Sequence, residues 1–151
     1  GDYIEHQELN RTDHPARVIQ IWYVADRHHR GLEPHYQQVG RANLPTRTIG
    51  DATVYSLIGA DSPMEQHITG RLTATTVPAG GVTQVEAPKE DEDLFLYVTD
   101  GTGQSVYGGQ EDVLDQYDVI LGRADMGDNT IQAGDENSLH YLSFYLPRFL
   151  S

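Results

Sequence analysis

The sequence contains no cysteine, so disulfide bonds and thiol nucleophiles are excluded. It has no apolar run of about 18 residues, which excludes a membrane-spanning helix. It also lacks a cationic start followed by an apolar segment, so no secretory signal is visible and we expect a cytoplasmic protein. Basic residues are scarce: 10 Lys and Arg oppose 23 Asp and Glu, for a net charge of −13. A field of this sign repels phosphate backbones, and direct nucleic-acid binding is therefore not expected.

Several catalytic signatures are missing as well. There is no GxSxG motif, no phosphate-binding loop and no GxGxxG preceding a helix. No stretch sustains a helical period, apart from a short turn of helix expected around residues 36–39. A length of 151 residues predicts a single domain with a substantial core.

Short runs of β-forming residues, separated by turn signals, make up most of the chain. The expected strands cover residues 17–25, 52–58, 72–77, 94–99, 104–107, 117–121, 130–133 and 139–146. A turn at 78–81 follows one strand, and Asp100-Gly101 predicts a hairpin between strands 94–99 and 104–107. This pattern predicts an all-β barrel or sandwich.

The segment 17–25 is set apart from the others. It is apolar on both faces, so we expect both faces to be covered. A polar connection over residues 26–44 follows, and a connection of this length is unusual inside one compact domain. The strand is therefore expected to belong to something other than the barrel that comes after it.

The polar connection contains three histidines, at positions 28, 29 and 35. Adjacent histidines point apart and Arg27 and Arg30 repel a cation, so we interpret His28, His29 and His35 as part of a solvated loop. The acidic run at residues 89–93 lacks the alternation and glycine of an EF-hand loop, and it is interpreted as a solvated barrel rim.

Three groups of residues resemble the pirin family of the cupin superfamily. The first is Tyr3-Ile4-Glu5-His6-Gln7-Glu8, followed by Gln20-Ile21-Trp22 and by Glu33-Pro34-His35-Tyr36-Gln37. The second is the turn Val77-Pro78-Ala79-Gly80-Gly81 with the segment 94–103. The third is Asp118-Val119-Ile120-Leu121 with Gly127-Asp128. The likeness covers most of the chain, and the linker motif is its most specific part.

The resemblance implies a metal site in the first of two cupin domains. There a His-x-His pair, a later His and a Glu hold one divalent ion, typically iron, and some members oxidise flavonols such as quercetin. His6 and Glu8 match the later His and the Glu, and on a strand both would face the same way. The chain has no His-x-His, so half of that ligand set is missing.

The second cupin domain offers a weaker ligand set. Gln84-Val85-Glu86 stands where metal-binding cupins have His-x-His, and His140 lies in the last expected strand. Glu86 and His140 could hold a metal weakly, or the barrel could be metal-free and structural.

The sequence thus predicts a cupin-type double-stranded β-helix, a jelly-roll barrel, with an N-terminal strand and linker. Residues 1–50 resemble the end of a first cupin and residues 51–151 the second cupin. One predicted function is a structural or interaction module without a complete metal site, paired with a second copy or a second cupin domain. The alternative is an iron-type dioxygenase of the quercetin 2,3-dioxygenase kind, with a flavonol-like ligand. It would use His6 and Glu8 together with ligands from another chain or from a missing N-terminal half.

Overall fold

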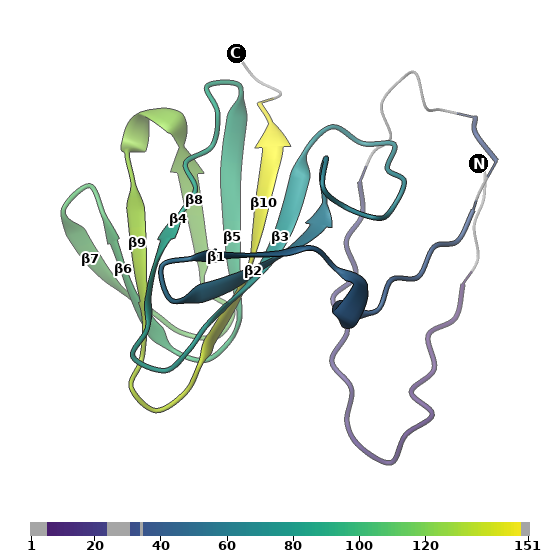
Figure 1. Ribbon diagram of the computed structural model, residues 1–151, viewed down its shortest axis with the longest axis horizontal. Coiled ribbons are helices and arrows are strands. Elements are labelled where there is room, and N and C mark those ends of the chain that lie inside the picture. The colour runs from purple at the N-terminus through teal and green to yellow at the C-terminus, as the bar shows by residue number, and fades with distance from the viewer. Residues whose placement is uncertain (1–5, 24–30, 34, 149–151) are drawn as a thin grey trace.

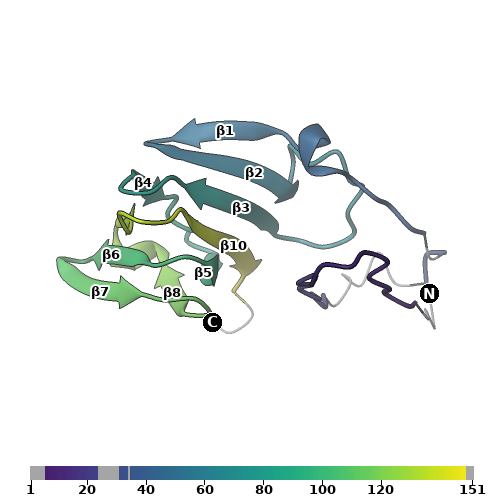
Figure 2. The ribbon, with the colours of Figure 1, turned by 90° about the horizontal axis from the view of Figure 1, so that it is seen from below.

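In a computed structural model, the structure describes residues 6–23, 31–33 and 35–148, and residues 46–147 form a two-sheet β-barrel (Figure 1). One antiparallel sheet has the order β1-β2-β3-β10-β5-β8 and the other β4-β9-β6-β7. The strands are β1 (Thr46–Ile49), β2 (Ala52–Ile58), β3 (Arg71–Val77), β4 (Val82–Val85), β5 (Glu92–Asp100), β6 (Gly103–Tyr107), β7 (Gln110–Leu114), β8 (Val119–Arg123), β9 (Asn129–Ala133) and β10 (Leu139–Pro147). Seen from below, β1, β2 and β3 form one wall and β6 and β7 the opposite one (Figure 2). The all-β prediction is confirmed.

Alternation along the strands builds the core between the two sheets. In β5, Leu94, Leu96 and Val98 are buried, whereas the residues between them are partly exposed. The partner strand β10 buries Leu139, Tyr141 and Tyr145 on the same side, and β9 adds Ile131. Because successive side chains of a strand point to opposite faces, the even-numbered residues of β10 lie on the outer face of the six-stranded sheet.

The prediction of a hairpin at Asp100-Gly101 is wrong. β5 pairs with β10 on one side and β8 on the other, so neither edge of β5 is free for β6. The chain instead crosses to the other sheet, where β6 pairs with β9 and β7. Gly101 is needed at this corner, because its φ is +83° and a Cβ there would collide with the backbone oxygen of Ser138. The tight hairpin of this region is β6–β7, turned by Gly108 and Gly109.

The predicted strand over residues 17–25 is also wrong as far as the structure describes it. Residues 6–23, here called the arm, contain no strand, and residues 24 and 25 lie outside the described part. An isolated strand needs a hydrogen-bonding edge, and the arm runs beside the barrel without pairing to one (Figures 1 and 2). It is held instead by side chains: the Arg17 guanidinium donates to the carbonyl oxygen of Thr99 at 2.7 Å.

The segment that leads into the barrel differs from expectation in two further details. No helical turn forms over residues 36–39; a 3₁₀ turn, η2, covers Arg41–Asn43. β1 then begins at Thr46, before the expected domain boundary at residue 51, and pairs with β2. A second 3₁₀ turn, η3, covers Ala124–Met126. Across the described ranges, no helix is both long and apolar enough to cross a membrane.

Candidate functional site

The barrel interior is filled by apolar side chains. The buried polar residues are uncharged, namely Thr73, Thr75, Thr83, Ser105, Asn129 and Ser143. No His, Asp or Glu is among the buried residues of the described chain. Asn129 differs from the other buried polar residues, because neither its side-chain oxygen nor its side-chain nitrogen has a hydrogen-bond partner among the described residues. The interior therefore offers amide and hydroxyl groups but no imidazole or carboxylate.

Glu86 belongs to an ion-paired cluster built around Arg71. Its carboxylate forms ion pairs with the guanidinium groups of Arg47 and Arg71. The Nη1 atom of Arg71 lies 3.1 Å from the Glu86 oxygen Oε2. Arg71 also lies 3.5 Å from the carboxylate of Glu92, and its guanidinium stacks 3.5 Å from the centre of the Tyr145 ring. Two arginines already neutralise the Glu86 carboxylate, and their positive charge opposes a metal ion at this position.

Two buried tyrosines of β10, Tyr141 and Tyr145, lie on the core side of the sheet. The Tyr145 hydroxyl donates to the backbone oxygen of Glu86 at 3.0 Å. Burial raises the pKa of Tyr145 above its ordinary value, and it raises the pKa of Tyr141 to about 12. Both phenols are therefore neutral hydrogen-bonding groups at physiological pH.

His140 lies on the opposite side of the sheet from this cluster. Its neighbours Leu139 and Tyr141 point into the core, so its ring points to the outer face. There the Nδ1 atom of His140 lies 3.1 Å from the hydroxyl of Thr76. The structure therefore does not bring Glu86 and His140 together into one site.

His6 and Glu8 lie on the arm and are exposed. The Nε2 atom of His6 is 3.1 Å from the side-chain nitrogen of Gln20, also on the arm. The strand that would have aligned His6 with Glu8 is absent from the described part of the arm. Neither residue belongs to a group of three metal-ligand side chains among the described residues. Their role as metal ligands stays a prediction.

A large apolar groove separates the arm from the outer face of the six-stranded sheet. It has a volume of about 620 Å³. The arm contributes Ile19, Ile21 and Trp22, and the sheet contributes Phe95, Tyr97 and Phe144. Phe95 and Phe144 are cross-strand partners whose rings meet edge to face at 5.6 Å. None of the residues that line the groove is charged.

One group of metal-ligand side chains does come together, outside the barrel. His35 of the linker meets Glu65 and His67 of the loop between β2 and β3, with their ligand atoms all within 4.8 Å of one another. The Nε2 atoms of His35 and His67 lie 3.9 and 3.8 Å from the two oxygens of the Glu65 carboxylate. We call these three residues the His–Glu–His cluster. Two imidazoles and a carboxylate are a ligand set that suits divalent transition metals.

Comparison with known proteins identifies the fold of this chain. No family model and no curated protein matches the sequence. Among solved structures, a cupin-2 domain from Rhodospirillum rubrum superposes with a TM-score of 0.56 at 15% identity, covering 78% of each chain. The polyketide cyclase RemF from Streptomyces resistomycificus gives 0.55 at 18% identity over 78% of this chain and 88% of its own. A cupin protein from Bacteroides fragilis gives 0.56 at 14% identity, over 79% and 90%.

The chain has a cupin fold. The pirin resemblance places its metal in the first of two cupin domains, whereas the barrel described here matches the second, and the buried core of this barrel contains neither histidine nor carboxylate. At these identities the structural likeness extends to the fold and not to the residues of a site.

The sequence interpretation missed two members of the His–Glu–His cluster. The sequence places His35 in a predicted solvated loop and gives no signal that singles out Glu65 or His67. The only local signal is the spacing Glu65-Gln66-His67, which is too common to indicate a site. The third ligand comes from a segment about thirty residues earlier in the chain, and only folding places it beside the other two. His28 and His29 lie outside the described residues.

Proposed function

We propose that this chain is a cupin-fold interaction module that pairs with a second copy of itself through the arm and the outer face of the six-stranded sheet. The observation that carries the proposal is the neutral apolar groove between these two parts. A groove with arm residues on one wall and sheet residues on the other is self-complementary. In a two-fold dimer each copy would contribute the same two surfaces.

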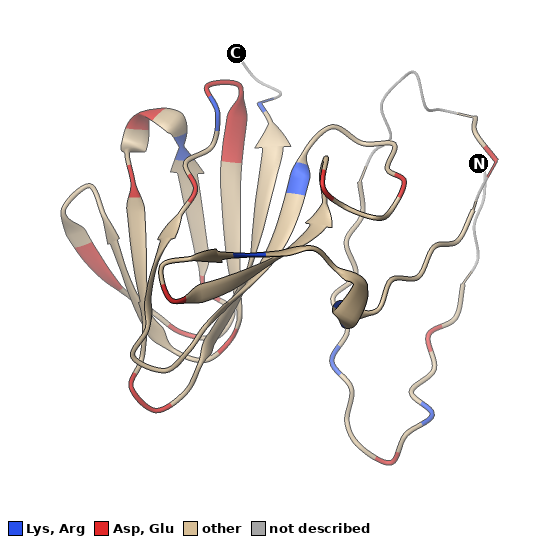
Figure 3. Cartoon of the chain, viewed as in Figure 1, with Lys and Arg blue, Asp and Glu red and all other residues tan. Residues whose placement is uncertain are grey.

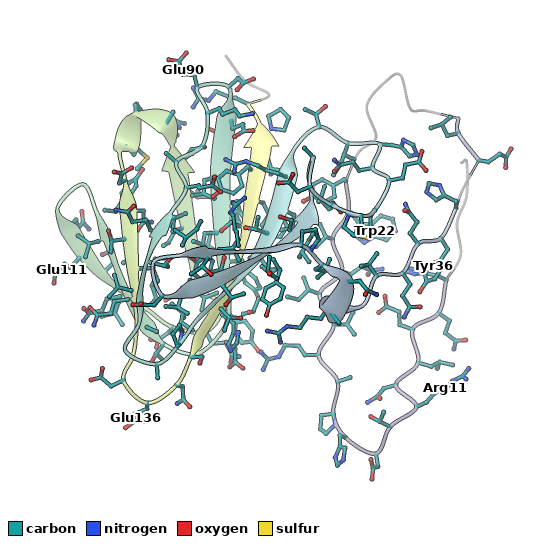
Figure 4. All side chains as sticks on the ribbon, viewed as in Figure 1. Arg11, Trp22, Tyr36, Glu90, Glu111 and Glu136 are labelled. Atoms are coloured by element: carbon teal, nitrogen blue, oxygen red, sulfur yellow. The ribbon has the colours of Figure 1, made fainter. Side chains whose placement is uncertain are left out.

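The arm leaves its apolar side chains poorly covered in a single chain. Trp22 is 80% exposed, and Ile19 and Ile21 are both more than a third exposed. Figure 4 shows Trp22 on the side of the molecule where the arm and linker lie. Burying a tryptophan fully removes about 150–250 Å² of surface from water, so leaving it exposed forfeits several kcal/mol of stabilisation. Insertion of the arm into a partner's groove would recover that contribution.

Charge favours the same contact surface. Acidic residues are scattered over the loops and strand ends of the barrel (Figure 3). Two copies of a chain with a net charge of −13 repel each other unless they meet through a neutral face. The residues that line the groove provide such a face, because none of them is charged.

The pirin resemblance is consistent with this arrangement and forms part of the proposal. Pirin-like proteins contain two cupin barrels joined by a linker, and here a second copy would supply the other barrel. A module of this kind needs no metal in its own barrel interior, in line with the apolar core described above.

The test is sedimentation velocity on untagged protein from 1 to 100 μM, together with the emission spectrum of Trp22, the only tryptophan. We expect a dimer with a blue-shifted emission, and Trp22→Ser should weaken its association at least tenfold. Leu9→Ser is the matched control, because Leu9 is an exposed apolar residue of the arm that does not line the groove. A monomer across this range with solvent-exposed Trp22 emission would refute the proposal.

The alternative function is a metal-dependent dioxygenase with a flavonol-like substrate. The observation that favours it is the His–Glu–His cluster, because two histidines and one carboxylate leave coordination positions open for dioxygen when iron(II) is bound. Oxygen uptake with quercetin by iron-loaded protein tests this function. Uptake that is lost in a Glu65→Gln variant would support it, and no uptake above free iron would remove it.

A further inference from the structure

We propose that the His–Glu–His cluster is a binding site for one divalent first-row transition metal ion, located outside the barrel. The ion would join the linker to the loop between β2 and β3. This site goes beyond the proposed self-association and does not depend on it. It also differs from a metal centre in the barrel interior, because none of its three ligands lies in the core.

The distances between the ligand atoms are close to those of a coordination sphere. At metal–ligand bond lengths of about 2.0–2.2 Å, two tetrahedral ligands lie about 3.4 Å apart. The two imidazole Nε2 atoms are 3.9 and 3.8 Å from the Glu65 oxygens. These contacts involve different oxygens of the carboxylate, and one ligand atom from each residue lies within 4.8 Å of the other two. Side-chain rotations are needed to reach coordination distances, and all three side chains are at least partly exposed.

The backbone holds these ligands together before any metal arrives. Gln37 donates its amide N–H to the backbone oxygen of Glu65 at 2.8 Å and accepts from the backbone N–H of Glu65 at 2.9 Å. This two-way amide pair aligns the linker with the loop. It sets His35 and His67 edge to face, with ring centroids 5.7 Å apart. A site that is ordered in advance loses less conformational entropy on binding.

The same glutamine also contacts one imidazole of the cluster. Its amide nitrogen lies 2.9 Å from the Nε2 atom of His35. An amide nitrogen can only donate, so this contact is a hydrogen bond when Nε2 of His35 carries the lone pair. An unprotonated ring nitrogen is the form that binds a metal, and the ion would take the place of the Gln37 donor.

The cluster borders a cavity. It lines a cavity of about 370 Å³, to which Gln66 and Tyr36 also contribute. The side-chain oxygen of Gln66 is buried and has no hydrogen-bond partner within the described part of the chain. Buried acceptors are rarely left unpaired, so we expect this oxygen to accept a hydrogen bond from a water molecule. Tyr36 is labelled in Figure 4 and marks this region of the linker.

The experiment is a calorimetric titration of Zn²⁺ into the full chain, stripped of metal and held in a buffer without chelating anions. We expect about one ion per chain. His35→Ala and His67→Ala should each weaken the binding at least tenfold, and Glu65→Gln should weaken it as well. Two variants serve as matched controls and should bind Zn²⁺ like the unmodified chain: His14→Ala, at an exposed histidine of the arm, and the double variant His28→Ala/His29→Ala.

Thermal unfolding gives a second readout that uses the same probe. Zn²⁺ binds only the folded arrangement of linker and loop, so it should raise the Tm of the unmodified chain and of both controls but not of His67→Ala. Circular dichroism of each variant without metal confirms that it folds. The proposal is overturned if no Zn²⁺ binds. It is also overturned if binding survives in His35→Ala and His67→Ala, or is lost in the His28→Ala/His29→Ala variant.

Discussion

Replacing Arg71 with methionine tests whether the ion-paired cluster stabilises the barrel rather than serving a ligand. Arg71 connects Glu86, Glu92 and the Tyr145 ring. In the variant Glu86 keeps Arg47, but the Glu92 side chain, only 13% exposed, loses its arginine partner. Removing one partner of a fully buried pair costs about 3–5 kcal/mol; this pair is only partly buried, so the lower end of that range applies. A lost cation–π contact costs about 1 kcal/mol, while the methionine stem retains most of the packing.

Lys89 partly replaces the missing charge, because its ammonium lies 4.0 Å from Glu92. We therefore expect Arg71→Met to lower the free energy of unfolding by about 3 kcal/mol. Adding Glu92→Gln should restore about 1–2 kcal/mol, since the unpaired carboxylate is then gone. The matched control is Arg123→Met: Arg123 is 66% exposed and 4.0 Å from Asp93, so its loss should cost less than about 0.5 kcal/mol.

The measurement is urea unfolding followed by far-UV circular dichroism. Trp22 fluorescence is unsuitable here, because the only tryptophan lies on the arm and reports the arm rather than the barrel. A loss below about 0.5 kcal/mol for Arg71→Met, equal to that of Arg123→Met, would show that the cluster is solvated and contributes little.

Three further outcomes follow from the core. Leu96→Ala should cost about 2–5 kcal/mol in the same urea assay, because Leu96 is fully buried in β5; a cost below 1 kcal/mol would contradict the packing described. Asn129→Leu should stabilise the chain by about 1 kcal/mol, since it removes two buried polar atoms without partners; destabilisation would indicate a ligand or water held by the amide. The pKa of Tyr141 is raised by burial from 10.0 to about 12, so the neutral phenol stabilises the fold fully below pH 10. That contribution to the free energy of unfolding should disappear as pH rises from 10 to 12. A free energy of unfolding that does not change over this pH range would refute the prediction. So would a Tyr141→Phe variant that loses as much stability over this range as the unmodified chain.

The sequence was sufficient for most of the barrel because alternation is a local property. The strands 52–58, 72–77 and 139–146 were recognised from their own residues and appear as β2, β3 and β10. The pairing partners could not be read in the same way. Asp100-Gly101 is a turn in either case, but whether it closes a hairpin or passes the chain between sheets depends on β8 and β10, which occupy both edges of β5.

The arm also shows that local sequence does not determine the pairing partners of a strand. Its apolar residues over 17–23 lead to the expectation that both faces are covered, but Trp22 is 80% exposed in the single chain. A strand also requires a partner edge, and the arm pairs with none. Composition could predict that these residues need a cover without predicting what the cover is.

The sequence by itself determined the fold class, the absence of thiol chemistry and the lack of His-x-His. Each of these depends on residue types or on neighbours along the chain. Only the tertiary structure decided that Glu86 is held by arginines, that His140 faces away from it, and that His35 meets Glu65 and His67. These relations join residues far apart in the chain, and their geometry arises from the packing of whole sheets and from the hydrogen bonds that attach the linker to the barrel.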